Sequence, residues 1–249
     1  MTAASSAKKR QIKLGAFRSA TGHHAASWRH PDTNPAGGTD FEHFRKLALL
    51  AEDARFDLIF TADSDAAWSP TGDPEIAKRL GRGERFEPLT LYSALAAVTR
   101  NIGFVATAST TYNEPWHIAR KFASLDLLSG GRAGWNIVTS GHAQAAANFG
   151  LQTHPDHAER YRRAGEFVDV VTGLWSTIEP DAYLRDKESG VYVRPEKIHT
   201  LDHAGEFFKV RGPLSVPRSP QGHPVLVQAG ASEPGRELAA RTAEAIFAA

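Results

Sequence analysis

The chain has 249 residues, 41% of them hydrophobic, which is enough for one sizeable core or two small ones. Its 29 basic and 28 acidic residues give a net charge of +1, so no charge excess predicts binding to nucleic acid or to an anionic membrane. The absence of cysteine excludes disulfides, thiolate metal sites and cysteine nucleophiles. The start lacks the apolar segment of a secretory signal and no apolar run could span a membrane, so we expect a soluble cytoplasmic protein.

Strand and helix patterns alternate along the chain. Short apolar runs that end in small or polar residues predict strands at 12–17, 57–63, 102–110, 134–140, 224–232 and 244–249. Helical periodicity and helix boundary signals predict helices at 41–56, 87–99, 117–129, 157–175 and 235–243. Pro88 suits the first turn of the second helix, and Gly130 suits the end of the third. Repeated strand–helix units are typical of a parallel sheet covered by helices.

The polar residues of these strands lie at their carboxyl ends, as in a closed barrel whose chemistry is placed where the strands finish. The residues concerned are Asp63, Thr107, Ser109, Thr110, Thr139, Ser140 and Ser232. Any one of them could merely cap a helix or shape a loop, but four strand ends together favour a site. A TIM-type (β/α)8 barrel needs eight strands. With six candidates, we expect an α/β barrel truncated after about six strands.

Two long segments interrupt the alternation, at 64–86 and at 176–223, and the second has the pattern of a β-hairpin. We interpret both as insertions in a single domain that spans 1–249. Such loops often form lids or substrate walls when they lie at the catalytic face of a barrel. Four aromatic side chains either line an apolar pocket or belong to the core: Phe17, Trp28, Trp68 and Trp135.

Two helix starts are candidate sites for a phosphate. His157 and Tyr161 are spaced i, i+4 and therefore share a face of the first turns of their helix, where free N–H groups attract anions. Ser232 precedes a helix that begins near Pro234 and could add a hydroxyl and further N–H groups. Alternatively, Tyr161 packs and His157 caps. His154 and His157 could share a metal ion, but no third ligand is apparent, so we expect no metal.

The region after the first strand contains His23, which could transfer a proton near neutral pH. A partly exposed polar loop is the alternative interpretation, and composition alone favours it. No dinucleotide fingerprint is present, because GRGERF (81–86) has two of the required glycines but no preceding strand.

Longer motifs together resemble one protein family. They are FTADS (60–64), FEPLTLYSALAAVT (86–99), ATASTTY (106–112), SGGRAGWNIVTS (129–140), HAERYRRAGEF (157–167) and VRGPLSVPRSPQGHPVLVQAGAS (210–232). The chain is similar to the flavin-dependent monooxygenases of the bacterial luciferase-like superfamily. It most resembles the branch that contains nitrilotriacetate monooxygenase component A, dibenzothiophene-sulfone monooxygenase and a pristinamycin synthase. GHHAASWRHPD (22–32) fits that branch too, so the resemblance covers nearly the whole chain, from about Ile12 to Ala249.

The resemblance implies a barrel that uses reduced FMN and O2, with a separate NAD(P)H:flavin reductase as its partner. The flavin would oxygenate a small organic substrate through its C4a-peroxide, while the protein excludes water and orients the substrate. Carried over by residue, the resemblance implies flavin contacts at Asp63, Thr107 and, as a weaker match, Asn136. It further implies phosphate contacts at His157, Tyr161 and Ser232. The remaining implied positions are Ser140, beside the reactive flavin edge, and His23, in catalysis.

The family continues through two more strands beyond EAIFAA (244–249), with their helices and further active-site loops. The six strand candidates therefore predict unpaired sheet edges, a homo-oligomer or a loss of stability, and weak activity for the 249-residue chain. Two alternatives stay open. One is a deazaflavin-dependent oxidoreductase of the same fold, against which GHHAASWRHPD (22–32) and VRGPL (210–214) argue. The other is a truncated flavin-binding module without catalysis.

Overall fold

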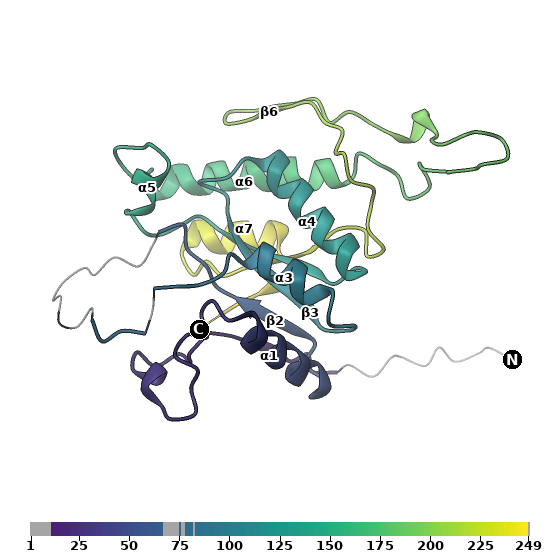
Figure 1. Cartoon of the computed structure of the whole chain (residues 1–249). Coiled ribbons are helices and arrows are strands. Elements are labelled where there is room, and N and C mark those ends of the chain that lie inside the picture. The colour runs from purple at the N-terminus through teal and green to yellow at the C-terminus, as the bar shows by residue number, and fades with distance from the viewer. Residues whose placement is uncertain (1–10, 67–74, 76–77, 82, 249) are drawn as a thin grey trace, which may run out of the picture.

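The computed structural model describes residues 11–66, 75, 78–81 and 83–248 (Figure 1). Its strands form a six-stranded sheet in the order β1-β2-β3-β4-β7-β8, and every neighbouring pair is parallel. The strands are β1 (Gly15–Phe17), β2 (Leu58–Thr61), β3 (Gly103–Ser109), β4 (Ala133–Val138), β7 (Val225–Gln228) and β8 (Ala245–Ile246). The predicted six-stranded parallel part of a barrel is therefore confirmed. Several strands are shorter than predicted: β1 begins only at Gly15, and Asp63, Ser140 and Ser232 already belong to the loops after their strands.

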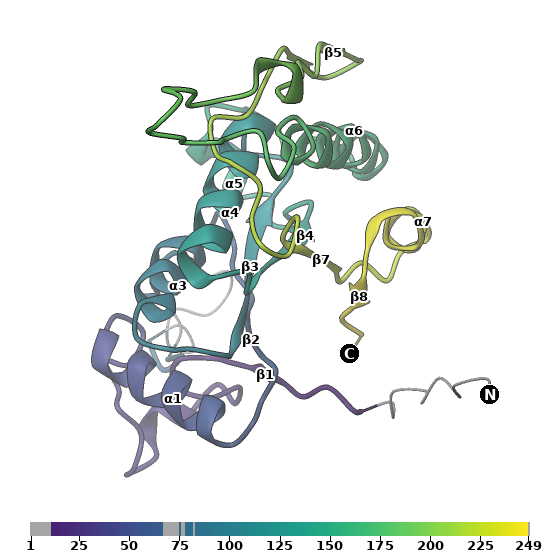
Figure 2. The same cartoon turned by 90° about the vertical axis from the view of Figure 1, so that its right-hand side faces the viewer.

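The helices alternate with the strands and lie along the outer side of the curved sheet (Figure 2). They are α1 (Phe41–Asp53), α3 (Pro88–Ala96), α4 (Pro115–Ser129), α5 (Ala145–Asn148), α6 (His157–Trp175) and α7 (Glu233–Thr242), with short 3₁₀ turns η1 (Ser27–Arg29) and η2 (Pro195–Lys197). None of the helices in these described residues is long and apolar enough to span a membrane.

Local signals explain where the helices begin and end. Pro88 occupies the first turn of α3, whose N-cap Glu87 accepts two backbone N–H groups with its carboxylate. Gly130 ends α4 in the left-handed conformation, with φ of 71°, as glycine permits without strain. The predicted helix at 41–56 ends at Asp53 because Arg55 already has φ of 63°. Local sequence therefore sets these boundaries, and tertiary packing holds the helices on the sheet.

The two faces of the sheet carry different clusters. The outer face packs on the helices through the large core that contains the fully buried Trp135 and Tyr92. The inner face carries a smaller cluster around Phe60, Val105 and Val227. Alternation along the strands places Thr107 and Asn136, which lie opposite one another on β3 and β4, on this inner face. Most apolar burial, and hence most of the hydrophobic stabilisation, lies between sheet and helices.

The segment 176–223 contains the predicted hairpin, formed by β5 (His203–Ala204) and β6 (Lys209–Val210). It follows the carboxyl end of α6 and folds back over the outer side of that helix (Figure 1). The Glu166 carboxylate on α6 accepts the backbone N–H groups of Phe207 and Phe208, both at 2.9 Å. In this arrangement the hairpin covers the outer side of α6, away from the carboxyl ends of the strands. Segment 176–223 is therefore not a lid over the strand ends but packs against the outer side of α6. The reason is that a loop that follows a helix emerges at the opposite end of the barrel.

The sheet has two outer edges, because β1 and β8 each pair with a single strand among the described residues. Phe17 on β1 is 42% exposed and Ile246 on β8 is 64% exposed. Unpaired edges and exposed apolar side chains promote association with further strands. We therefore predict that the 249-residue chain alone self-associates, or unfolds at a lower temperature than a version extended by two strands. Light scattering and thermal melts of both proteins test this, and a monomeric chain with an unchanged melting temperature would contradict it.

Candidate functional site

Two adjoining cavities lie at the carboxyl ends of β2, β3, β4 and β7. Their volumes are about 290 Å³ and about 240 Å³, and both are lined by Asp63, Ser64 and Val138. The first extends past Thr107 and Ser109, and the second past Ser140, Tyr161, Gln228 and Gly230. The structure thus brings most of the polar strand ends recognised in the sequence to one continuous site.

Asp63 follows β2 and lies between the two cavities. Its side chain is 22% exposed, and its Oδ1 lies 3.8 Å from Nε of Arg85. Burial raises the pKa of the Asp63 carboxyl to about 6, despite a hydrogen bond from the Ser64 backbone and the charge of Arg85, and the neighbouring Asp65 and Glu87 carboxylates raise it further. Asp63 therefore changes charge just below neutral pH inside the site.

Thr107 and Asn136 form a hydrogen-bonded pair on the inner face. The hydroxyl of Thr107 donates to the Thr61 carbonyl at 2.8 Å, and Nδ2 of Asn136 donates to Oγ1 of Thr107 at 2.8 Å. Asn136 is only 2% exposed, yet its Oδ1 has no hydrogen-bond partner among the described residues. A buried acceptor without a donor is costly, so a ligand donor that reached this oxygen would relieve that cost. Asn136 itself lines neither cavity, but its partner Thr107 lines the first.

Ser140 follows β4 in a left-handed conformation, with φ of 49°. Its Oγ lies 2.6 Å from Oδ2 of Asp65 and 2.6 Å from Oγ of Ser109. Its carbonyl accepts a hydrogen bond from the guanidinium of Arg160 on α6 at 2.9 Å. Backbone strain of this kind in a serine persists only where surrounding contacts fix it, and it is concentrated at functional sites.

The predicted phosphate residues come together beside the second cavity. Ser232 is the N-cap of α7, and its Oγ accepts the Gly235 N–H at 3.3 Å, which leaves its own proton free to donate. A Cβ added to Gly230 would lie 2.8 Å from Oη of Tyr161, and one added to Gly235 would lie 3.0 Å from it. Only glycine therefore lets the backbone come this close to the hydroxyl. His157 stacks on Tyr161 with ring centroids 4.8 Å apart.

The two helix starts differ in the charge of their caps. Asp156 caps α6 and accepts the Glu159 N–H at 2.8 Å, so a carboxylate already interacts with that helix N-terminus. The cap of α7 is the neutral hydroxyl of Ser232, and the carboxylate in its first turn, Glu233, is paired with Arg236. An anion is therefore better placed at α7, with His157 and Tyr161 contributing side chains from α6 rather than backbone N–H groups.

His23 lies apart from these residues, at the end of β1. Its Nε2 is 3.2 Å from the Phe17 carbonyl and its ring packs on the Phe17 ring at 4.8 Å. The ring is exposed to solvent, and His23 does not contribute to the lining of either cavity. Among the described residues, His23 therefore contacts Phe17 rather than the lining of either cavity.

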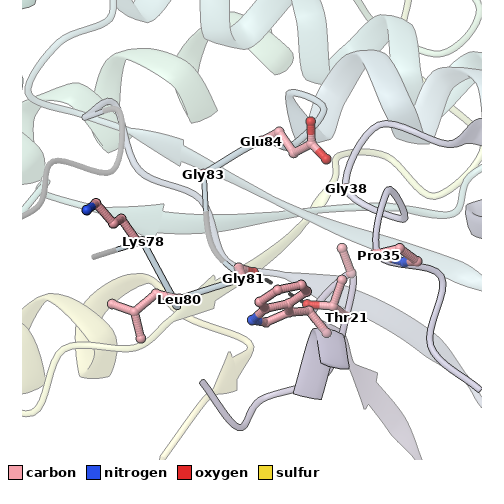
Figure 3. Close-up of a pocket in the computed structure, with 10 residues that line it drawn as sticks. Thr21, Pro35, Gly38, Lys78, Leu80, Gly81, Gly83 and Glu84 are labelled. Carbon is pink, nitrogen blue, oxygen red and sulfur yellow. Dashed lines mark hydrogen bonds between the residues drawn. The ribbon is translucent and has the colours of Figure 1, made fainter. Parts of the chain in front are cut away.

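A further cavity of about 410 Å³ lies between the loop after β1 and residues 78–81, 83 and 84 (Figure 3). Trp28 lines it and donates from Nε1 to the Arg79 carbonyl at 2.9 Å, and Thr21 donates to the Gly81 carbonyl at 3.4 Å. Trp135 instead belongs to the core, and Phe17 lies on the inner face. Trp68 lies outside the described residues. Of the three aromatic candidates within the described residues, Trp28 thus lines one of these cavities, and Phe17 and Trp135 line none of them.

No group of three or more histidine, aspartate or glutamate residues in the described part of the chain could hold a metal ion. His154 is engaged elsewhere, with Nδ1 at 2.6 Å from the hydroxyl of Tyr112.

The profile of the family described as Luciferase-like monooxygenase matches residues 21–249. The chain is 54% identical to N-acetyl-S-(2-succino)cysteine monooxygenase of Bacillus subtilis, over 97% of this chain and 53% of that protein. It is 51% identical to nitrilotriacetate monooxygenase component A of Aminobacter aminovorans, over 96% of this chain and 54% of that protein. Among solved structures, riboflavin lyase with modified FMN and riboflavin matches at 40% identity and a TM-score of 0.88, over 96% of this chain and 54% of that one. The chain thus spans about half the length of the curated relatives it matches.

Two residues of the site were missed as candidates in the sequence. Asp65 contacts Ser140, and Arg160 anchors the end of β4 to α6. Arg160 is adjacent to Tyr161 in the HAERY motif, and Asp65 is two positions after Asp63, so proximity to residues already singled out was the available signal. Neither position follows a strand directly, and only the fold places them here.

We predict a pH-dependent effect of Asp63→Asn on stability. Because the folded-state pKa of Asp63, about 6, lies above its ordinary value of 3.8, folding favours the protonated carboxyl and the free energy of unfolding falls as pH rises through this range. Asparagine mimics the protonated form. The variant should be more stable than the parent at pH 8, by about 1–3 kcal/mol, and the difference should shrink toward zero near pH 4.

Urea unfolding at several pH values measures this difference. Asp53→Asn, at an exposed carboxyl of α1, is the matched control and should show no comparable trend. A constant effect of Asp63→Asn from pH 4 to pH 8 would contradict the burial argument.

Proposed function

Because the chain belongs to the luciferase-like monooxygenase family, we propose that it acts as the oxygenase component of a two-component system. It would take reduced FMN from a separate NAD(P)H:flavin reductase and use O2 to oxygenate a small organic substrate. The related nitrilotriacetate monooxygenase is itself named as a component, which supports a division of labour. The proposal also includes a homo-oligomer, because the sheet edges are open.

The observation that carries the proposal is the glycine-lined cradle at the start of α7. Gly230 and Gly235 let the backbone approach the Tyr161 hydroxyl, and Ser232 offers a free proton beside the first N–H groups of a helix. Neutral donors around a helix N-terminus suit a phosphate monoester such as that of FMN. A riboflavin lyase solved with modified FMN shares this half of the fold, which supports the assignment.

The ring of the flavin would occupy the cavities that meet at Asp63. Thr107 and Asn136 would hold it from the inner face, with the unpartnered Oδ1 of Asn136 accepting a hydrogen bond from it. Ser140 would lie beside its reactive edge. When bound, the flavin supplies the activation of oxygen, while the protein excludes water and orients the substrate. In this proposal His23 remains a residue for proton transfer, from the end of β1.

We predict that replacing Tyr161 by Phe and Ser232 by Ala together weakens FMN binding by about 2–4 kcal/mol, since each hydroxyl supplies a hydrogen bond to a charged phosphate worth about 1–2 kcal/mol. Calorimetric titration with FMN measures the loss. The matched control is Tyr183→Phe with Ser124→Ala, which removes the same two groups from the outer segment and from α4. Equal affinity of the double variant and the parent would place the phosphate elsewhere.

We further predict that the purified chain with FMN does not oxidise NADH or NADPH on its own. The reason is the missing dinucleotide fingerprint, together with the proposed reliance on a reductase. The absorbance of NADH at its near-ultraviolet band is followed with and without an added flavin reductase, and the reductase alone serves as the control. Rapid loss of NADH without the reductase would refute the two-component assignment.

A further inference from the structure

The hydroxyl of Ser140 has one proton and two close partners. Its Oγ is 2.6 Å from the Asp65 carboxylate and 2.6 Å from the Ser109 hydroxyl. A carboxylate can only accept, so the proton of Ser140 is committed to Asp65. Ser109 must then donate to Ser140, and it keeps its lone pairs for the Thr111 N–H, which lies at 3.1 Å. Ser140 is left with a lone pair and no free proton.

The contacts around these three residues fix this arrangement. The Asp65 carbonyl accepts a hydrogen bond from Nδ2 of Asn148 at 3.0 Å, and the Ser140 carbonyl accepts one from Arg160. The left-handed backbone of Ser140 is held between these contacts. The direction of the hydrogen bonds is therefore set by the protein before any ligand arrives, which is the condition for preorganised recognition.

We propose that Asp65 is a positioning residue that makes Ser140 a hydrogen-bond acceptor toward the flavin, and so makes the site selective for reduced FMN. This inference rests on the proposed function, which puts Ser140 beside the reactive edge of the ring. Reduced flavin carries a hydrogen on N5 at that edge and donates, whereas the same nitrogen of oxidised flavin can only accept. An acceptor at Ser140 would form a hydrogen bond with N5–H of reduced flavin, but it would face the lone pair of N5 in oxidised flavin. A buried polar group without a hydrogen-bond partner is costly, so the oxidised form would bind more weakly.

If charge alone mattered, removal of Asp65 would change the preference for reduced over oxidised FMN in the opposite direction. At neutral pH the reduced ring is negatively charged and the oxidised ring is neutral, so a carboxylate nearby disfavours reduced FMN. Loss of that charge should therefore strengthen the preference for the reduced form. If hydrogen-bond polarity dominates, loss of Asp65 frees the proton of Ser140 and weakens the preference. The two causes are thus separated by the direction of the change.

The test compares the dissociation constants of oxidised and reduced FMN, measured by anaerobic calorimetric titration of the 249-residue chain. We expect the parent to favour reduced FMN, and Asp65→Ala to lower that preference about tenfold, as one mismatched hydrogen bond predicts. Ser109→Ala is the matched control, because it removes the other partner of Ser140 but leaves the Ser140 hydroxyl donating to the Asp65 carboxylate. Its preference for reduced FMN should stay within about twofold of the parent.

A second variant guards against an Asp65→Ala protein that fails to fold. Ser140→Gly tolerates the left-handed backbone, removes the acceptor and should lower the preference as Asp65→Ala does. An unchanged or increased preference in the folded variants would overturn the role of Asp65 while FMN binding itself stands. If the parent binds neither form of FMN, both this inference and the proposed function are wrong.

Discussion

The pairing of β3 with β4 is the interaction on which the rest of the site depends. Its register runs from Phe104 opposite Ala133 to Ser109 opposite Val138, and it is the longest ladder of the sheet. It puts Thr107 opposite Asn136 on the inner face and brings Ser109 to Ser140, just past the end of β4. A slip of one residue would turn these polar groups into the apolar layer under the helices. The buried Trp135 opposes that slip, because it belongs to the outer core.

This register also explains why polar side chains can be buried on the inner face at all. The Thr61 carbonyl accepts a hydrogen bond from the Thr107 hydroxyl, and the Thr107 hydroxyl accepts one from the Asn136 amide. A backbone carbonyl of β2 therefore sets the direction of a hydrogen-bond series that crosses three strands. The series ends at Oδ1 of Asn136, which has no donor. A network satisfied except at one end is costly for folding alone, and its retention is understandable where a ligand completes it.

Much of this arrangement follows from the sequence. Alternating apolar runs and helical periods predict the parallel sheet, and hydroxyls at the strand ends predict the position of the site. Ser232, Tyr161 and Thr107 can be recognised in this way because each lies directly at a strand end or at the start of a helix. The contacts of Asp65 and Arg160 cannot, since they depend on where separate loops meet. The position of His23 also depends on how its loop folds, so the sequence did not predict it. The path of 176–223 over α6 depends on the hydrogen bonds between Glu166 and the hairpin.

The cavities and the open edges of the sheet are formed by different strands. The cavities and the α7 cradle are built from β2, β3, β4, β7 and the helices after them, all within the described residues. The open edges, in contrast, lie at β1 and β8, where Phe17, Phe60 and Phe247 pack together on the inner face. In the proposed function, recognition of the phosphate and of the ring edge would therefore use contacts that do not involve the sheet edges. Exclusion of water from the ring would depend on how the inner face is covered. Affinity for FMN and productive use of oxygen would then be set by different parts of the same barrel wall.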